Sequence, residues 1–274
     1  MMDNSIAYTN RDGETVEMRI DGTWHYGGTD LHDYEWAYDT VADRVAGFRR
    51  EPRDFSLKVM MDGGSVSERN RLVDVFERDV AAMEPGTLRV GASELRCWIV
   101  ASSKSSWWFS EGIMGADLTV HADEPVWTRE AGFEFKKVAG TGDSTGLDYP
   151  FDYPFDYSSS GVSSTIESPF AVPSACRITV YGPAASPYII IAGNRYQVDA
   201  AVEDGGLLVV DGLARTITVS NADGQRMNAF SAGVREDGAN VFAKVPAGTH
   251  AVSWGGAFGF DVALIEERSE PAWA

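Results

Sequence analysis

The chain has 274 residues, 44% of them hydrophobic, and a formal net charge of −18. This composition excludes a mainly disordered chain, and the length suits two domains of ordinary size. Residues 1–145 carry 16 Lys or Arg against 26 Asp or Glu, a balance of −10, and residues 146–274 carry 7 against 15, a balance of −8. Because phosphate groups are bound by clusters of Lys and Arg, this charge argues against binding of nucleic acid or anionic lipid.

Neither a targeting signal nor a membrane span is expected from this sequence. The first five residues lack a basic region followed by an apolar run, so we expect no secretory signal. The longest apolar runs, such as residues 188–192, are far shorter than the ~20 residues that a membrane-spanning helix needs. Cys97 and Cys176 lie in strand-like runs, and we expect both to be buried thiols of a protein made in a reducing cytosol.

The first 61 residues mix clear and unclear patterns. Residues 15–20 predict a short strand, and residues 54–61 predict another because apolar and polar residues alternate there. Between them, residues 22–47 are rich in aromatic and acidic side chains and fit neither the helical nor the strand period. We expect either an aromatic-rich loop or a curled pair of strands in this segment.

A helix is predicted over residues 65–83. Ser65 and Glu68 fit a capping box, and Pro85-Gly86 ends the run. The apolar residues at helical spacing are Leu72, Phe76, Val80 and Met83. Further strands are predicted at residues 87–90, 94–102 and 112–122. The helix is expected to cover these strands, so this half should be an antiparallel barrel or sandwich with one helix.

Residues 147–157, called here the aromatic strap, alternate strictly between aromatic residues and Asp or Pro. In an extended strand one face would carry Tyr149, Phe151, Tyr153, Phe155 and Tyr157. Pro150 and Pro154 lack the backbone N–H, so the strap should pair along one edge only. Gly- and Ser-rich segments flank it, which favours a connector held by its aromatic face; a terminal strand of the first domain is the alternative. Either arrangement needs an apolar groove or a partner surface.

Beyond residue 166 the pattern consists of short strands and turns. Strands are predicted at residues 177–181, 188–191, 195–198, 207–210, 215–220, 241–245, 251–254 and 258–266. The turn sequences are Gly193-Asn194, Asp204-Gly205-Gly206, Asp211-Gly212, Asp223-Gly224 and Ala247-Gly248. This spacing is typical of hairpins in a β-sandwich.

Patterns that would indicate catalysis or metal binding are weak. His25 and His32 with Asp30 and Asp33 would make the best metal cluster, but solvated loop residues explain such a pattern more often. No nucleophile elbow or phosphate-binding loop occurs, and among 41 acidic residues a pair of carboxylates says little about glycosidase chemistry. We therefore expect no enzyme, and no catalytic, cofactor-binding or metal-binding residues.

Carbohydrate binding is the main alternative for the second half of the chain. Exposed aromatic rings stack on sugars, and the candidates are Tyr181, Tyr188 and Trp254. Aromatic residues of a sandwich lie more often in its core. The sequence does not decide between these two roles.

Four segments occur in an informative order: residues 122–127 (acid, Pro, aromatic), 175–189 (strand, Gly-Pro, strand), 241–254 (Phe, apolar-Pro-x-Gly, strand) and the ending Glu270-Pro271-Ala272-Trp273. Together they resemble the distal tail proteins of long-tailed, siphovirus-type bacteriophages. The first segment resembles the close of that family's N-terminal domain, and the other three resemble the opening, a hairpin and the ending of its C-terminal domain. Residues 22–47 depart from the family pattern because they are more aromatic and acidic.

The resemblance implies a mainly β protein with three parts. Residues 1–139 would form a ring-forming, split-barrel-like domain with one helix, residues 140–166 an aromatic and Pro-containing connector, and residues 167–274 a galectin-like β-sandwich. The implied function is that of a structural virion protein, a distal tail adaptor whose hexameric ring connects the tail tube to the tail-tip or baseplate hub. No sugar-contacting residue is carried over, because none matches.

The resemblance also implies partners and a location. The partners would be further copies of the chain, the major tail tube protein, the hub protein and, as a further candidate, a receptor-binding protein; specific nucleic-acid binding and membrane contact are not expected. The protein would be assembled in the host cytoplasm and lie at the virion tail tip. The alternative is a carbohydrate-binding or host-adhesion module that acts through the C-terminal sandwich.

Overall fold

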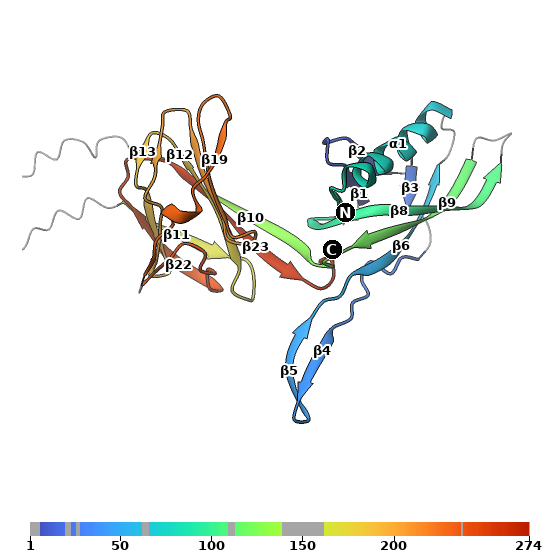
Figure 1. The fold of residues 1–274 in the computed structure, drawn as a ribbon, viewed down its shortest axis with the longest axis horizontal. Helices are drawn as coiled ribbons and strands as arrows, with labels where there is room; N and C mark the ends of the chain where they lie inside the picture. The colour runs from blue at the N-terminus through green and yellow to red at the C-terminus, as the bar shows by residue number, and fades with distance from the viewer. Residues whose placement is uncertain are drawn as a thin grey trace, which may run out of the picture. The chain divides into compact units, whose positions relative to one another are not determined.

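The computed structural model describes residues 6–19, 23–25, 28–61, 66–108, 113–138, 162–236 and 238–273, with backbone alone for residues 24, 25, 61, 66–69 and 105–108. The chain divides into two compact units (Figure 1). The barrel unit comprises Met1–Arg129 and Glu267–Ala274, and the sandwich unit comprises Glu130–Glu266. Most of the predicted connector, residues 140–166, lies outside the described residues, so the domain boundaries drawn from the sequence stay a prediction.

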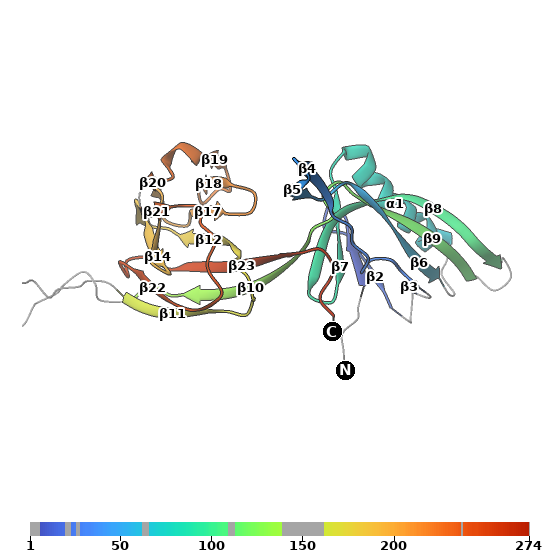
Figure 2. The same cartoon turned by 90° about the horizontal axis from the view of Figure 1, so that it is seen from below.

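The barrel unit is a sheet that closes on itself. Its elements are β1 (Ile6–Thr9), β2 (Thr15–Met18), β3 (Thr23–His25), β4 (Ala37–Val41), β5 (Arg44–Arg49), β6 (Arg53–Met61), α1 (Val66–Ala82), β7 (Gly86–Val90), β8 (Ser93–Trp108) and β9 (Ile113–Ala122). The pairing order is β8-β7-β1-β2-β3-β6-β9, and β9 pairs again with β8, which closes the barrel (Figure 2). Strand β10 (Trp127–Phe135) begins on β8 in this unit and ends in the sandwich unit.

The barrel core follows from strict alternation along its strands. In β6, Phe55, Leu57 and Val59 are buried while Asp54 and Ser56 are exposed. Strands β8 and β9 repeat this pattern, and the strands predicted in this half are confirmed. Since alternate side chains of a strand point to opposite faces, one face of each strand fills the barrel and the other meets solvent.

Helix α1 confirms the predicted helix, but the set of apolar residues predicted to face the barrel was partly wrong. The residues turned toward the barrel are Leu72, Val75, Phe76 and Asp79, whereas Val80 and Met83 are 44% and 81% exposed. The ring of Phe76 packs edge-on against Tyr8, with 5.4 Å between ring centroids. A buried Asp thus takes a place that hydropathy assigns to an apolar residue, because polar groups of the barrel wall bind it. Ser65 and the side chain of Glu68, the predicted capping box, lie outside the described residues.

The sandwich unit consists of two facing sheets. Besides β10, its strands are β11 (Val162–Ser168), β12 (Ala175–Tyr181), β13 (Ala184–Ala185), β14 (Tyr188–Ile191), β15 (Asn194–Gln197), β16 (Ala201–Val202), β17 (Leu207–Asp211), β18 (Thr216–Ser220), β19 (Arg226–Asn228), β20 (Arg235–Glu236), β21 (Ala239–Asn240), β22 (Gly248–Trp254) and β23 (Phe260–Arg268), with a short 3₁₀ helix, η1 (Phe230–Ala232). One sheet has the order β19-β18-β17-β12-β23-β10 and the other the order β11-β22-β14-β15-β21-β20. The short strands β13 and β16 pair with each other.

Aromatic rings fill the space between the two sheets. Phe135 stacks on Phe260 with 4.7 Å between ring centroids, and Trp254 meets Phe260 edge-on at 5.1 Å. The two cysteines are buried and free, as predicted, one in each unit. Burial raises the pKa of the Cys97 and Cys176 thiols to about 12, so both stay protonated and unreactive near neutral pH.

One strand predicted for this unit was wrong. Residues 241–245 form turns, with a single β-bridge between Ser174 and Val245. The backbone N–H of Phe242 donates to the side-chain oxygen of Asn240 at 3.0 Å, and the N–H of Ala243 donates to the Asn240 carbonyl at 3.1 Å. Since these local hydrogen bonds use the donors that a ladder would need, Asn240 starts a turn in an apolar run.

The predicted fold class, mainly β with a barrel-like first half, one helix and a C-terminal β-sandwich, is confirmed. Within the described part of the chain, no helix is long and apolar enough to cross a membrane.

Candidate assembly surface

The hairpin of β4 and β5 stands apart from the barrel to which it belongs. The two strands pair only with each other among the described residues, and Figure 1 shows the hairpin extending away from the barrel strands. Its two-residue turn, Ala42-Asp43, has φ values of 50° and 60°, the left-handed conformation that matches the twist of a tight hairpin. Residues 22–47 therefore contain a curled pair of strands, one of the two arrangements expected from the sequence. An isolated two-stranded sheet is marginally stable in water.

One face of this hairpin is aromatic. Tyr38 lies opposite Phe48 in the register, and Val45 lies opposite Thr40 beyond a bulge. Alternation places Trp36 on the same face, where its ring meets Phe48 edge-on at 6.4 Å between centroids. Tyr38 and Phe48 are 61% and 66% exposed. We call this set, Trp36, Tyr38, Val45 and Phe48, the aromatic face.

The opposite face of the hairpin is charged. The Arg49 guanidinium forms an ion pair with Asp39 and another, at 3.0 Å, with Glu51. The hydrogen bonds that Arg49 donates, to Asp39 foremost and then to Glu51, raise the pKa of Arg49. Val41 and Arg44, which pair beside the turn, share this face by alternation. The hairpin is thus amphipathic, and Tyr38 and Phe48 on its apolar side stay more than half exposed.

The C-terminal tail holds the base of the hairpin. The Arg50 guanidinium lies over the Trp36 ring, 4.3 Å from its centroid, and donates to the Ser269 hydroxyl at 3.4 Å. The Trp273 ring stacks on His32 with 3.9 Å between ring centroids. The last residues of the chain therefore belong to the barrel unit and connect to the root of the hairpin.

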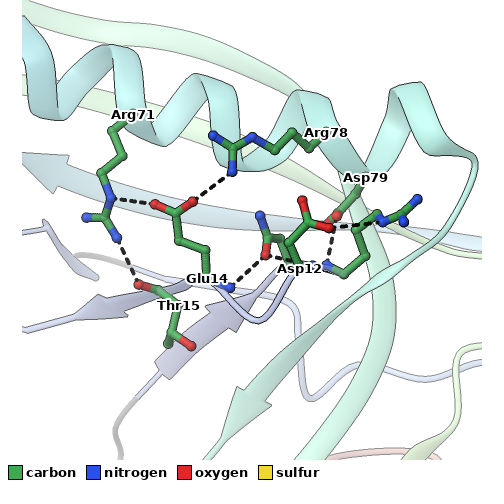
Figure 3. Close-up of polar contacts among 8 residues, drawn as sticks. Asp12, Glu14, Thr15, Arg71, Arg78 and Asp79 are labelled. Atoms are coloured by element: carbon green, nitrogen blue, oxygen red, sulfur yellow. Dashed lines mark hydrogen bonds and ion pairs between the residues drawn. The ribbon is translucent and has the colours of Figure 1, made fainter. Parts of the chain in front are cut away.

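A second set of polar contacts fixes α1 to the loop between β1 and β2 (Figure 3). The carboxylate of Glu14 accepts from Arg71 at 2.7 Å and from Arg78 at 3.0 Å, two arginines of α1 that face the same side. Arg71 also donates to the Thr15 carbonyl at 3.3 Å. The hydrogen bond from Arg71 is the main reason that the pKa of Glu14 is lowered. One loop carboxylate thereby joins two turns of the helix.

The buried Asp79 anchors the other end of α1. Its carboxylate accepts the Tyr8 hydroxyl at 2.5 Å and the backbone N–H of Arg11 at 2.9 Å. Burial, and then the bond to Asp79, raises the pKa of Tyr8. A Cβ on Gly86 would lie 2.5 Å from the Tyr8 hydroxyl, so only glycine fits beside this pair. These contacts hold the C-terminal half of α1 against β1 and the loop that follows it.

Between α1 and the barrel wall lies a cavity of about 480 Å³, called here the apolar groove. Apolar side chains that line it are Val16, Met18, Val59, Leu72, Val73, Phe76, Ile99, Val100, Met114, Ala116 and Leu118. Two of them, Val73 of α1 and Val100 of β8, are 45% and 49% exposed. Within the described residues, the groove is a second apolar surface of the barrel unit that meets solvent.

The residues that the sequence suggested for binding do not come together in a site among the described residues. The aromatic strap, with Tyr149, Phe151, Tyr153, Phe155 and Tyr157, lies outside the described residues and stays a prediction. Of the weak metal cluster, His32 stacks on Trp273 and Asp30 accepts the Ser56 backbone N–H at 2.6 Å, while the His25 side chain is not described. No group of three His, Cys, Asp or Glu side chains in the described ranges is placed to hold a metal ion.

The proposed sugar platform does not form around Trp254. This residue is buried in the sandwich core, and its indole N–H donates to the Phe258 carbonyl at 3.2 Å. Tyr181 is exposed and its hydroxyl donates to Asp261, and the ring of half-buried Tyr188 is covered by the Arg195 guanidinium at 4.4 Å. Trp254 therefore has the core role that the sequence left open.

Sequence reasoning missed both apolar surfaces of the barrel unit. The aromatic content of residues 22–47 was visible, but the bulge between Asp39 and Thr40 and the alternation on both sides of the turn were not recognised. The groove has no local sequence signal, because residues from six elements meet there.

No protein-family model matches the sequence, and no curated protein matches it. Solved structures do. SPP1 Dit, described as a paradigm of the hub adsorption apparatus in phages that infect Gram-positive bacteria, is similar with a TM-score of 0.51 at 9% identity, over 96% of this chain and 98% of that chain. The phage P2 baseplate in its activated conformation, solved with Ca and with Sr, contains chains with a TM-score of 0.58 at 11% identity, over 97% of this chain and 99% of those chains. The chain therefore shares, over nearly its whole length, the fold of a phage hub protein and of phage baseplate chains.

Proposed function

We propose that the chain is a structural protein of a bacteriophage tail, a distal tail adaptor whose hexameric ring connects the tail tube to the hub at the tail tip. The observation that carries this proposal is the shared fold. It extends over nearly the full length of this chain and of the SPP1 Dit and P2 baseplate chains compared with it. The order of the four sequence motifs independently indicates the same class of protein. In this role the protein acts by binding and not by catalysis.

The aromatic face supports a role in assembly. Three aromatic rings on an otherwise unpartnered hairpin are apolar surface of the kind that marks protein–protein contacts. A closed ring covers such surfaces and leaves no free end, and it uses the same contact at every junction. The proposed partners are further copies of the chain, the tail tube protein, the hub protein and a receptor-binding protein.

The charge of the chain suits a ring through which DNA passes. Residues 1–145 carry a balance of −10, and a ring of such subunits repels the phosphate backbone instead of holding it. We expect an acidic bore in the assembled ring. A surface-potential map of that ring with a basic bore would contradict this part of the proposal.

Labelled virions provide the direct test. An antibody against the sandwich unit, coupled to gold, should mark the end of the tail far from the capsid in electron micrographs of the virus that encodes this chain. Particles lacking the chain should show tails without their tip structure. Labelling of the capsid, or particles without any label, would contradict a tail-tip role.

The mass of the purified protein distinguishes the adaptor from the alternative, a monomeric carbohydrate-binding or host-adhesion module. Light scattering should find a hexamer or larger rings, and purified tail tubes should promote the ring where the protein alone is smaller. A protein that stays monomeric with tail tubes present and binds host-wall carbohydrate would support the module.

A further inference from the structure

Two apolar surfaces of the barrel unit are exposed at the same time. Tyr38, Val45 and Phe48 of the aromatic face are more than half exposed, and the apolar groove beside α1 is open. Arg50 of the same chain lies over the Trp36 ring, but Tyr38 and Phe48 stay 61% and 66% exposed. Leaving both in water is unfavourable, because each large aromatic side chain removes roughly 150–250 Å² from water when it is buried.

The two surfaces lie on opposite sides of the barrel. Figure 1 shows the hairpin leaving the barrel on the side away from α1, whereas the groove lies under α1. The hairpin therefore does not reach the groove of its own chain. A second copy has no such restriction, and contact between two different patches of identical chains is head-to-tail, the type of interface that closes into rings.

Size and chemistry agree with this pairing. A cavity of about 480 Å³ lies within the range of roughly 300–1,000 Å³ in which proteins hold compact apolar groups. The tip of the hairpin carries Asp43 and Arg44, and Lys104 and Glu77 line the groove. Opposite charges are therefore present on both sides of the apolar contact, which favours one orientation of docking.

We infer that the aromatic face of one copy, centred on Tyr38 and Phe48, inserts into the apolar groove of a second copy beside Val73 and Val100. This inference rests on the proposed ring and names the contact that would form each junction. The competing arrangement pairs two hairpins across a two-fold axis. That arrangement buries the aromatic face but leaves the groove open, so the two make different predictions for cross-linking.

Cysteine cross-linking tests the contact directly. Both native cysteines are buried with raised pKa values, so an engineered pair provides the reactive thiols. We expect Phe48→Cys combined with Val73→Cys, or with Val100→Cys, to form covalent multimers under mild oxidation. Phe48→Cys alone should give no covalent dimer. A dimer from the single variant would overturn the inference in favour of hairpin–hairpin pairing.

Mixing of blocked variants tests the head-to-tail geometry. Tyr38→Ser with Phe48→Ser removes the insert, and Val73→Arg with Val100→Arg blocks the groove. Each variant alone should associate at least roughly 30-fold more weakly than the native chain, as expected for loss of a central interface residue. Mixed together, the two variants have one intact hairpin and one intact groove, so they should form heterodimers that cannot grow further.

A matched control is available on the same hairpin. Val41 is 67% exposed but lies on the charged face, so Val41→Ser should assemble as the native chain does. Circular dichroism and melting temperature should be unchanged in all of these variants, because each altered side chain is exposed.

The outcomes separate this inference from the proposed function. Rings that form with the hairpin removed, or without hairpin-to-groove cross-links, would overturn the inference and leave the tail adaptor intact. A native chain that stays monomeric at every soluble concentration would also overturn it, because the contact needs no other protein. Virions that carry the label on the capsid, or that carry no label, would contradict the adaptor itself.

Discussion

Two hairpins of this protein have the same kind of turn and opposite surroundings. The turn of β4–β5, Ala42-Asp43, and that of β14–β15, Ala192-Gly193, each consist of two residues with positive φ. Strand β14 also pairs with β22, and the apolar side chains of Ile189 and Ile191 are buried. The β4–β5 hairpin has no third strand within the described residues, and its apolar side chains face outward.

The difference lies in what each hairpin packs against and not in its local sequence. A sheet face stabilises its own chain only when another layer covers it. The sandwich supplies that layer for β14–β15, whereas the barrel supplies none for β4–β5. The β14–β15 hairpin therefore contributes to folding, and the β4–β5 hairpin is available for assembly.

The largest expected effect comes from the buried hairpin. Ile191→Ala should lower the free energy of unfolding of the sandwich unit by about 2–5 kcal/mol, because it removes fully buried methyl groups and leaves a cavity. Urea unfolding followed by tryptophan fluorescence measures this change. The matched variant in the other hairpin is Phe48→Ala, for which we expect a change within about 0.5 kcal/mol. Equal losses in the two variants would show that the aromatic face is covered within the monomer.

The next effect concerns the polar anchor of α1. Tyr8→Phe removes one of the two described donors to the buried Asp79 carboxylate and should cost about 1–3 kcal/mol of stability in the barrel unit. Tyr38→Phe, which removes an exposed hydroxyl from the hairpin, is its control and should leave stability unchanged. A neutral Tyr8→Phe variant would contradict the role of Asp79 as an anchor.

The tail that holds the hairpin base should matter less. Trp273→Ala loses the stack on His32 and should cost about 0.5–1.5 kcal/mol. Because Ser269 of the same tail binds Arg50 beside Trp36, amide hydrogen exchange in β4 and β5 should become faster. Unchanged exchange in both strands would mean that the hairpin keeps its position without the tail.

The smallest effect is pH-dependent and lies on the barrel wall. His121 binds Asp54 at 2.6 Å and Asp123 at 3.1 Å, and these bonds, that of Asp54 foremost, raise its pKa. A raised pKa in the folded state means that the stabilisation is complete below about pH 6.5, the ordinary value, and is lost as the pH rises through the folded-state pKa.

For this partly exposed pair we expect a loss of about 0.2–1 kcal/mol across that interval. Unfolding measured on both sides of it should show the loss in the native chain and not in His121→Gln. A barrel unit that becomes more stable as the pH rises through this interval would contradict the assignment.

Much of the strand pattern was readable from the sequence because it depends on neighbours along the chain. Alternation in β6 is local and was predicted correctly. The turn predicted at Gly193-Asn194 lies one residue earlier, at Ala192-Gly193. The run at residues 241–245 was wrongly predicted as a strand although the cause is also local, because Asn240 accepts from the N–H groups of Phe242 and Ala243 and starts a turn. The aromatic character of residues 22–47 was visible, but its exposure was not.

Composition and the period along the chain were enough to predict the class of the fold, the two β-rich units and the burial of both cysteines. Three features became visible only in the folded chain: Asp79 is buried, the tail ending in Trp273 belongs to the barrel unit, and β4–β5 pairs with no third strand among the described residues. The physical reason is that each of these depends on partners distant in the chain. A side chain is buried or exposed according to what lies opposite it in space, and the period along a strand does not contain that information.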